Sequence, residues 1–497
     1  MLFNSINFMV FFPIVIMVYF FISRKYRYLW LLVSSYYFYM CWNPKYILLI
    51  AASTVITWSS GVLIEKYRTE KKSLCKCILA VCFISNIGIL VFFKYFDFIL
   101  MNINSVLGKF GIALLEKPFD VVLPVGISFY IFQALSYTVD IFQGGGISAE
   151  RNLLKYALFV SFFPQLVAGP IERSGNLLNQ INDLPNKKLW DYERIANGLL
   201  LMVWGYFQKM VIADRVAVLV DTVFSSYYMF GSLELVAAAI GFAVQIYCDF
   251  ASYSTIAIGA SQVMGITLME NFQMPYFARS IKEFWHRWHI SLSTWFRDYL
   301  YIPLGGSRCS KKRKYFNLMV TFLVSGLWHG ANWTYVFWGG IHGLYQIVGA
   351  ELAGVKNKLN KACKTKTNCI SYKIGQAAVT FILVDFAWIF FRSNSLKDAF
   401  YYIERIFTRF NPWVLFDGTI YTWGLNRFEI NVLLVAIVIL ILVDIIGYKK
   451  QMRIDTFLQS QCIWFRWGVV ILWIVGIAVF GMYGPAYNAK QFIYFQF

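Results

Sequence analysis

The sequence predicts an all-α polytopic membrane protein with about 11 to 13 transmembrane or re-entrant helices. Three observations lead to this prediction: 59% of the 497 residues are hydrophobic, only 14% are charged, and long apolar runs follow one another along the chain. A soluble domain is nearer roughly 45–50% apolar and about 25% charged. The composition therefore excludes a soluble enzyme, a disordered chain and a secreted disulfide scaffold.

The apolar runs are long enough to be membrane helices, because about 20 helical residues cross the hydrocarbon core. They lie near residues 7–22, 28–42, 46–64, 76–96, 120–142, 153–170, 195–213, 233–260, 315–330, 333–353, 374–391, 430–447 and 463–483. The shorter runs are expected to be tilted or re-entrant. No fixed-period repeat and no pair of matching halves is visible, so we expect one integral membrane domain over 1–497.

Basic residues predict the topology. Lys and Arg number 45 against 26 Asp and Glu, which gives a net charge of +19. The basic residues crowd short loops near 24–27, 66–76, 308–314 and 356–373. The positive-inside rule places these loops in the cytoplasm and the amino terminus outside, so the excess charge does not indicate nucleic-acid binding. The first apolar run has no basic segment before it, which favours a retained span over a cleaved signal.

Four histidines, all between residues 286 and 342, are the main candidates for chemistry. An ionisable side chain inside a membrane is costly and therefore suggests function. His329 lies 15 residues after Lys314, and His342 lies 14 residues before Lys356. At about 1.5 Å per residue, both are expected roughly 20 Å from the cytoplasmic surface, on consecutive helices. His329, with glycine neighbours that allow close approach, is the strongest candidate; the alternative is a structural histidine bonded to a backbone carbonyl.

His286 and His289 are three residues apart, which predicts that they share one face of a helix. The surrounding stretch, 282–301, is amphipathic and aromatic, and is expected to be re-entrant or interfacial. Anchoring at the membrane interface is the alternative role for this pair.

A metal site is the rival use of the histidines, with His329 as a third ligand. However, there is no HExxH pattern, the nearest acids are Glu283 and Asp298, and the nine cysteines are scattered. The cluster Cys75, Cys77 and Cys82 has no second Cys or His pair to complete a zinc set. We therefore expect no metal.

Six segments carry a resemblance to a known family. They are Leu123 to Tyr130, Phe163 to Ile171, Tyr247 to Ser254, Phe284 to His289, Arg297 to Gly306 and Gly326 to Gly330. With these segments the chain resembles the membrane-bound O-acyltransferases (MBOAT), specifically the alginate O-acetyltransferase (AlgI) and peptidoglycan O-acetyltransferase branch. The resemblance covers about 120–345, and the flanking helices match in character only.

The resemblance implies a ring of helices with a cytoplasmic and an extracytoplasmic funnel. It places the family's catalytic histidine on His329 and its second motif histidine on His289. Residues near them in sequence are expected to support the site: Trp328, Asn332, His342, His286 and Asp298. The implied donor is a substrate, acetyl-CoA or another acyl thioester, and no cofactor is expected to be tightly bound. The acceptor is an exported polysaccharide, and the implied partner is an extracytoplasmic SGNH-type acetyltransferase.

The carboxyl-terminal tail, 484–497, follows the last apolar run and ends in a Phe-x-Tyr-x-x-Phe pattern from Phe492 to Phe497. This pattern resembles a tail found in or beside such acetylation systems. The hydroxyl of Tyr494 is a candidate acyl acceptor. The alternative is an aromatic residue of the membrane interface.

Two other functions stay open at this point. One is transfer of D-alanine or another acyl group from a carrier protein to teichoic acid, as in the related teichoic-acid D-alanylation protein. The other is a transporter or proton relay that uses the histidines as shuttles. In each case the protein is expected in a bacterial cytoplasmic membrane. The sequence identifies neither the polymer nor the oligomeric state.

Overall fold

The computed structural model describes residues 1–117, 123–144, 146–167 and 169–483. Within these ranges all regular structure is helical, and every predicted apolar run lies on at least one helix. The predicted all-α membrane fold is confirmed. The chain divides into two compact units, Met1–Leu199 with Ala257–Met269 and Leu200–Ile256 with Glu270 onward, and each is described by itself.

The first unit is built around helix α3. Its elements are α1 (Ile6–Phe21), η1 (Arg24–Tyr26), α2 (Arg27–Met40), η2 (Pro44–Tyr46), α3 (Ile47–Tyr67), α4 (Lys72–Leu90), η3 (Val91–Tyr95), α5 (Phe96–Lys109), α6 (Ile127–Gln143), α7 (Leu153–Ser161), α8 (Phe163–Leu166) and α9 (Ser174–Asn182). Helix α3 packs against α4, α6 and α7. Small and hydroxyl side chains permit this packing: a Cβ on Gly61 would lie 2.6 Å from the ring of Tyr137, and Tyr156 donates a hydrogen bond to Thr57 at 2.8 Å.

The second unit contains all four histidines. Its elements are η4 (Phe207–Ala213), α11 (Asp214–Ser225), η5 (Tyr227–Met229), η6 (Pro275–Phe277), α13 (Ile281–Arg287), α14 (Ile290–Phe296), η7 (Arg297–Tyr301), α15 (Lys311–His329), α16 (Trp333–Ala362), α17 (Ile370–Arg392), α18 (Leu396–Thr408), η8 (Pro412–Leu415), η9 (Thr419–Thr422), α19 (Arg427–Lys450), α20 (Ile454–Gln459) and α21 (Ile463–Phe480). Helices α10 (Tyr192–Tyr206) and α12 (Ser232–Val263) run through the unit boundary.

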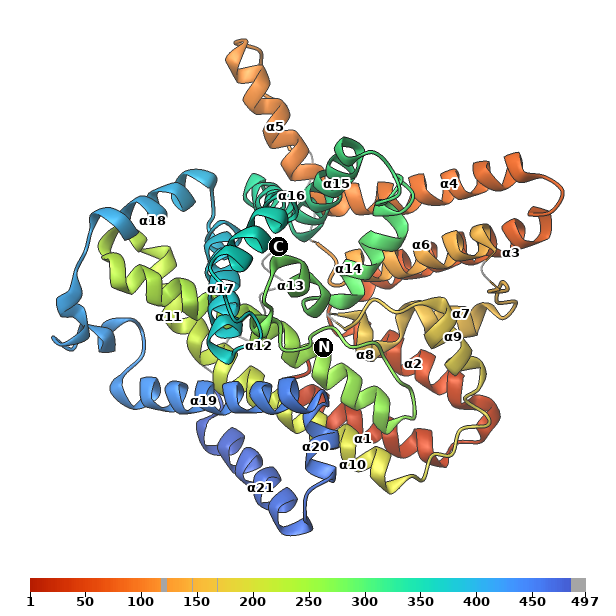
Figure 1. Ribbon diagram of the computed structural model, residues 1–497. Coiled ribbons are helices and arrows are strands. Elements are labelled where there is room, and N and C mark those ends of the chain that lie inside the picture. The colour runs from red at the N-terminus through yellow and green to blue at the C-terminus, as the bar shows by residue number, and fades with distance from the viewer. Residues whose placement is uncertain (118–122, 145, 168, 484–497) are drawn as a thin grey trace. The chain divides into compact units, whose positions relative to one another are not determined.

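The core of the second unit is strongly aromatic. Trp338 on α16 and Trp388 on α17 are fully buried, and their rings stack at 5.5 Å between centroids. Helix α16 contacts α13, α15 and α17, which places the histidine-bearing segments around this stack (Figure 1). The core therefore holds the region where function is expected.

Seven helical segments among the described residues are long and apolar enough to cross a membrane. They are Pro44–Tyr67, Lys72–Lys109, Tyr192–Ser225, Ser232–Val263, Ile370–Arg392, Arg427–Lys450 and Ile463–Phe480. The protein is thus a multi-pass membrane protein. The run predicted at 153–170 differs from expectation, because α7 ends at Ser161 and a separate short helix starts at Phe163, next to Pro164.

Candidate functional site

His329 is the last residue of α15, and glycines hold this helix close to α16. A Cβ on Gly326 would lie 2.2 Å from the carbonyl oxygen of Tyr335, and a Cβ on Gly339 would lie 2.2 Å from that of Phe322. Only glycine permits such backbone contact. His329 is 5% exposed. The tight helix pair therefore fixes this imidazole inside the protein.

His289 lies at a break in the chain where the sequence predicts a continuous helix. Helix α13 ends before it and α14 begins after it, and His289 has a left-handed φ of 43°. This conformation is strained for a non-glycine residue and persists only where the surroundings hold it. Here Asn271 holds it: its carbonyl oxygen accepts from the N–H of Ile290 at 3.0 Å, and its side chain accepts from the N–H of Ser291 at 3.2 Å.

The break corrects the prediction that His286 and His289 share one helical face. His286 is exposed, whereas His289 is 1% exposed and packs edge-on against the ring of Phe250 at 4.6 Å. The chain leaves the helix between the two side chains, because α13 ends at Arg287 and Trp288 is extended. Burial lowers the pKa of His289 to about 3, so the ring is neutral near pH 7.

The two predicted catalytic histidines come together. The ring centroids of His289 and His329 lie 6.4 Å apart with an angle of 65° between the planes. The indole of Trp328 contacts both, at 6.0 Å from His289 and 5.0 Å from His329. Trp338 and Phe391 pack on the other sides of His329, at 5.1 and 5.4 Å. The arrangement is a buried imidazole pair in an aromatic shell.

His342 belongs to the same aromatic cluster but lies one side chain further away. It is fully buried on α16, and Trp338 contacts both His342, at 5.0 Å, and His329. The indole Nε1 of Trp285 donates a hydrogen bond to Nδ1 of His342 at 3.2 Å. The structure thus brings three of the four histidines into one cluster.

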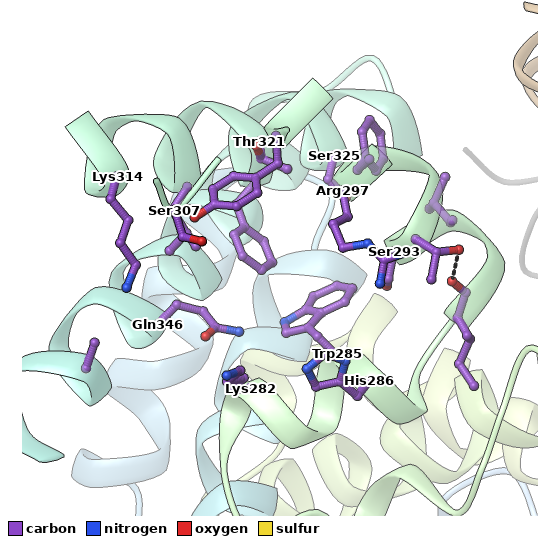
Figure 2. Close-up of a pocket in the computed structure, with 18 of the residues that line it drawn as sticks. Lys282, Trp285, His286, Ser293, Arg297, Ser307, Lys314, Thr321, Ser325 and Gln346 are labelled. Carbon is purple, nitrogen blue, oxygen red and sulfur yellow. Dashed lines mark hydrogen bonds between the residues drawn. The ribbon is translucent and has the colours of Figure 1, made fainter. Parts of the chain in front are cut away.

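A cavity of about 510 Å³ lies beside this cluster, with walls from α13 to α16. Lys282, Arg297 and Lys314 line it together with His286, and its lining includes no Asp or Glu among the described residues. Figure 2 shows Lys314 and Arg297 on opposite sides of the cavity, with Trp285 between them. The charged side chains that line the cavity are therefore all basic, and the cavity suits an anionic ligand.

The other residues predicted to belong to the site lie outside the histidine cluster or outside the described residues. Asp298 is half-buried and pairs at 2.8 Å with Arg297, which lines the cavity. The side chain of Asn332 caps α16: it accepts from the N–H of Thr334 at 3.0 Å and donates to the carbonyl of Asn394 at 3.0 Å. Asn332 thus shapes the turn after His329. Tyr494 lies outside the described residues.

Sequence reasoning missed the contribution of three aromatic residues. Trp285 lines the cavity and contacts His342, while Trp338 and Phe391 enclose His329. Tryptophan and phenylalanine are so frequent in this chain that no local pattern marks these three. Among the described residues, no group of three His, Cys, Asp or Glu side chains is arranged to hold a metal ion.

The fold and the buried histidine pair define a class of protein, a helical multi-pass membrane protein with a candidate histidine site. Residues 143–391 match the membrane-bound O-acyltransferase family (MBOAT), and the chain belongs to this family. It is therefore an acyltransferase, and the transporter alternative is set aside.

Curated relatives extend the match beyond that region. A probable alginate O-acetylase AlgI from Pseudomonas putida is 36% identical over 445 residues, covering 88% of this chain and 85% of the relative. A peptidoglycan O-acetyltransferase from Helicobacter pylori is 34% identical, covering 75% of this chain and 72% of the relative. A teichoic acid D-alanyltransferase from Bacillus subtilis is 27% identical, covering 56% and 70% respectively.

Proposed function

We propose that this protein takes an acetyl group from a cytoplasmic thioester, acetyl-CoA, and passes it across the membrane to O-acetylate an exported cell-envelope polysaccharide. Relatives named alginate O-acetylase and peptidoglycan O-acetyltransferase support the acetyl group and the envelope polymer. A bacterial cytoplasmic membrane and an external amino terminus complete the proposal, on the basis of the basic loops.

The cationic cavity beside the histidine pair carries the proposal. Acetyl-CoA is a phosphorylated thioester, and guanidinium and ammonium groups are the usual ligands of phosphate. Lys314 lies in the loop-proximal first turn of α15, in a segment predicted to be cytoplasmic, while Ser325 lines the cavity one turn before His329. The cavity thus extends along α15 from predicted phosphate contacts toward the candidate base.

In the proposed reaction, the acceptor hydroxyl oxygen attacks the thioester carbonyl carbon while His329 takes the hydroxyl proton. The C–S bond breaks, and the leaving thiolate receives the proton from His329. The products are an acetyl ester and free CoA thiol, so atoms and protons balance. His289, neutral and 6.4 Å from His329 between centroids, donates its N–H to the carbonyl oxygen and stabilises the charge that develops there.

The acceptor in this reaction is the hydroxyl of Tyr494, of a partner protein or of the polymer itself. An extracytoplasmic SGNH-type acetyltransferase is the proposed partner that completes transfer to the polysaccharide. The partner and the tail acceptor follow from the resemblance of the sequence, and Tyr494→Phe tests the latter: unchanged acetylation excludes Tyr494 as an acceptor.

D-alanyl transfer from a carrier protein is the second candidate, favoured by the match to a teichoic acid D-alanyltransferase. That match covers less of this chain, at lower identity, than the O-acetylase matches. A thioester on a carrier protein would place its phosphate in the same cationic cavity, so the cavity does not distinguish the two donors. The transferred group, acetyl or D-alanyl, does distinguish them.

The deciding measurement is ester-linked acetate on exported envelope polymers. Wild type, a deletion strain, and the deletion strain carrying His329→Ala are compared at matched membrane levels of protein. We expect acetate to fall in the deletion and to return with wild type but not with His329→Ala. Loss of D-alanine esters in place of acetate would support the second candidate, and no change in either ester would contradict acyl transfer to these polymers.

A further inference from the structure

One tryptophan connects the cavity with the buried cluster. Trp285 lines the cavity, and its indole extends between α13 and α15 (Figure 2). The same indole contacts the ring of Phe322 at 5.2 Å and that of Trp338 at 5.7 Å. Trp338 in turn contacts His329 at 5.1 Å. The two indoles therefore form a chain of ring contacts from the cavity lining to the candidate catalytic imidazole.

His342 determines where the Trp285 indole lies. Its Nδ1 accepts the indole N–H at 3.2 Å. The His342 ring is itself fixed, because it is fully buried and lies nearly parallel to Phe284 and Phe322, with interplanar angles of 9° and 21°. Since Nδ1 is the acceptor, the neutral ring carries its proton on Nε2. A side chain of similar volume without an acceptor would fill the space but leave the indole N–H unsatisfied.

His342 lies one ring removed from the candidate catalytic imidazole. Trp338 lies between it and His329, at 5.0 Å from one ring and 5.1 Å from the other. A role for His342 in the reaction would therefore act through a neighbour, and its side chain accepts a hydrogen bond from Trp285.

We propose that His342 is a positioning residue, which holds the Trp285 indole as the inner wall of the cavity and so shapes the seat of the donor thioester. This inference rests on the proposed function, because it assigns the cavity to the donor. A wall that contacts the donor equally in the ground state and the transition state contributes to KM and leaves kcat unchanged.

The choice of substitutions separates the two nitrogens of His342. Asn places its amide near the position of Nδ1 and Gln places its amide near that of Nε2, whereas Phe keeps the ring without an acceptor. Each variant, purified in nanodiscs, is tested for acetyl-CoA affinity by calorimetry, and for KM and kcat by release of CoA thiol. We expect His342→Phe and His342→Gln to raise KM roughly tenfold with kcat within about threefold, since one hydrogen bond is lost. His342→Asn should stay within about threefold of wild type.

Trp285→Phe supplies an independent check, because it removes the donor of the same hydrogen bond. It should raise KM roughly as much as His342→Phe, and the double variant should show no further increase. Thermal unfolding is measured for every variant, and Trp285→Phe keeps the test informative if His342→Phe fails to fold.

Several results would overturn the proposal. Rescue by Gln rather than Asn would assign the role to Nε2. A fall in kcat at constant KM would indicate that His342 takes part in the chemistry, and multiplicative effects in the double variant would show that Trp285 and His342 act separately.

The wild-type protein separates failure of this inference from failure of the proposed function. A wild-type protein that neither binds nor consumes acetyl-CoA or another acyl thioester would overturn both. Normal wild-type turnover with unchanged variants would overturn the inference alone.

Discussion

The rings of His289 and His329 lie 6.4 Å apart between centroids, although 40 residues separate them in the sequence. Hydrogen-bond reach is about 3 Å from each ring nitrogen, so a reacting group between the rings can contact both. One ring comes from the end of a long helix and the other from a strained break between two short helices. The glycines of α15 and α16 hold His329, and Asn271 holds His289. Substitutions at these residues therefore test the site separately from substitutions of the histidines.

We expect His329→Ala to lower acyl transfer by about 10²- to 10⁴-fold, since the proposed general base is lost. His289→Ala should lower it by a similar order, because the proposed hydrogen-bond donor to the thioester carbonyl is removed. Initial rates of CoA release are measured at saturating donor. Asn332→Ser serves as the control, since it alters a neighbouring residue outside the pair. Loss of activity in that control equal to the loss in the histidine variants would contradict the assignment.

Asn332→Ala is expected to lower the free energy of unfolding by about 0.5–2 kcal/mol, because the cap of α16 is lost. Asn332→Ser and Asn332→Asp retain a capping oxygen and should recover most of this stability. Thermal unfolding in detergent, together with activity per folded molecule, checks the prediction. Unchanged stability with a large fall in activity per folded molecule would show that Asn332 belongs to the site chemistry.

Glycine substitutions should push α15 and α16 apart where their backbones touch, and should have little effect elsewhere on α16. Gly326→Ala and Gly339→Ala each place a Cβ 2.2 Å from a backbone oxygen of the facing helix, so we expect loss of folded protein or of activity. Gly349→Ala and Gly354→Ala lie on the same α16 with nothing within 4 Å of the added Cβ, and should fold normally. Fluorescence-detected gel filtration measures the folded yield. Equal yields for all four variants would contradict the packing.

Much of the fold is predictable from the sequence because the bilayer imposes long apolar runs. The run predicted at 374–391 became α17, Ile370–Arg392, and the joint placement of His329 and His342 on consecutive helices holds in the structure. The amphipathic α18 was missed because hydropathy alone does not mark it. The length and apolar character of the runs thus predict the long helices of the fold.

The site is less predictable, because tertiary contacts build it. The break at His289 depends on hydrogen bonds that Asn271, 18 residues earlier, accepts from the backbone after His289, so spacing alone suggested one continuous helix. Asn332 was placed in the site by nearness, whereas its side chain caps a helix. The proposed role of Trp285 depends on a hydrogen bond to His342, 57 residues away. None of these partners is visible in a local pattern.

A buried ion triad gives a further test of the second unit. Lys209 contacts Asp214 at 2.8 Å and also Asp249, and all three side chains are no more than 3% exposed. Lys209→Met leaves two carboxylates without their cation and should cost about 3–5 kcal/mol of stability. Adding Asp214→Asn and Asp249→Asn removes the stranded charges and should restore part of the loss. A single variant as stable as wild type would show that the triad contributes no net stability.

The cationic cavity predicts an electrostatic effect on donor binding. Lys314 lines the cavity, whereas Lys312, two residues earlier in the same helix, is exposed and is not among the lining residues. Lys314→Glu brings a negative charge close to the proposed site of the donor phosphates, so we expect KM for acetyl-CoA to rise several-fold at low salt. Lys312→Glu makes the same change in net charge at a distance that solvent and ions screen, and should raise KM much less.

Ionic strength provides the decisive comparison between these two variants. If the lysine acts on phosphate through the cavity, the difference in KM between Lys314→Glu and Lys312→Glu should shrink as salt rises from about 0.05 to 0.5 M, while kcat stays similar. Acetyl-CoA and the unphosphorylated thioester acetyl-pantetheine are compared as donors, because only the former carries phosphate charge. An equal KM increase with both donors would show that Lys314 acts by shape rather than charge, and equal effects of the two variants would contradict the placement of the donor in this cavity.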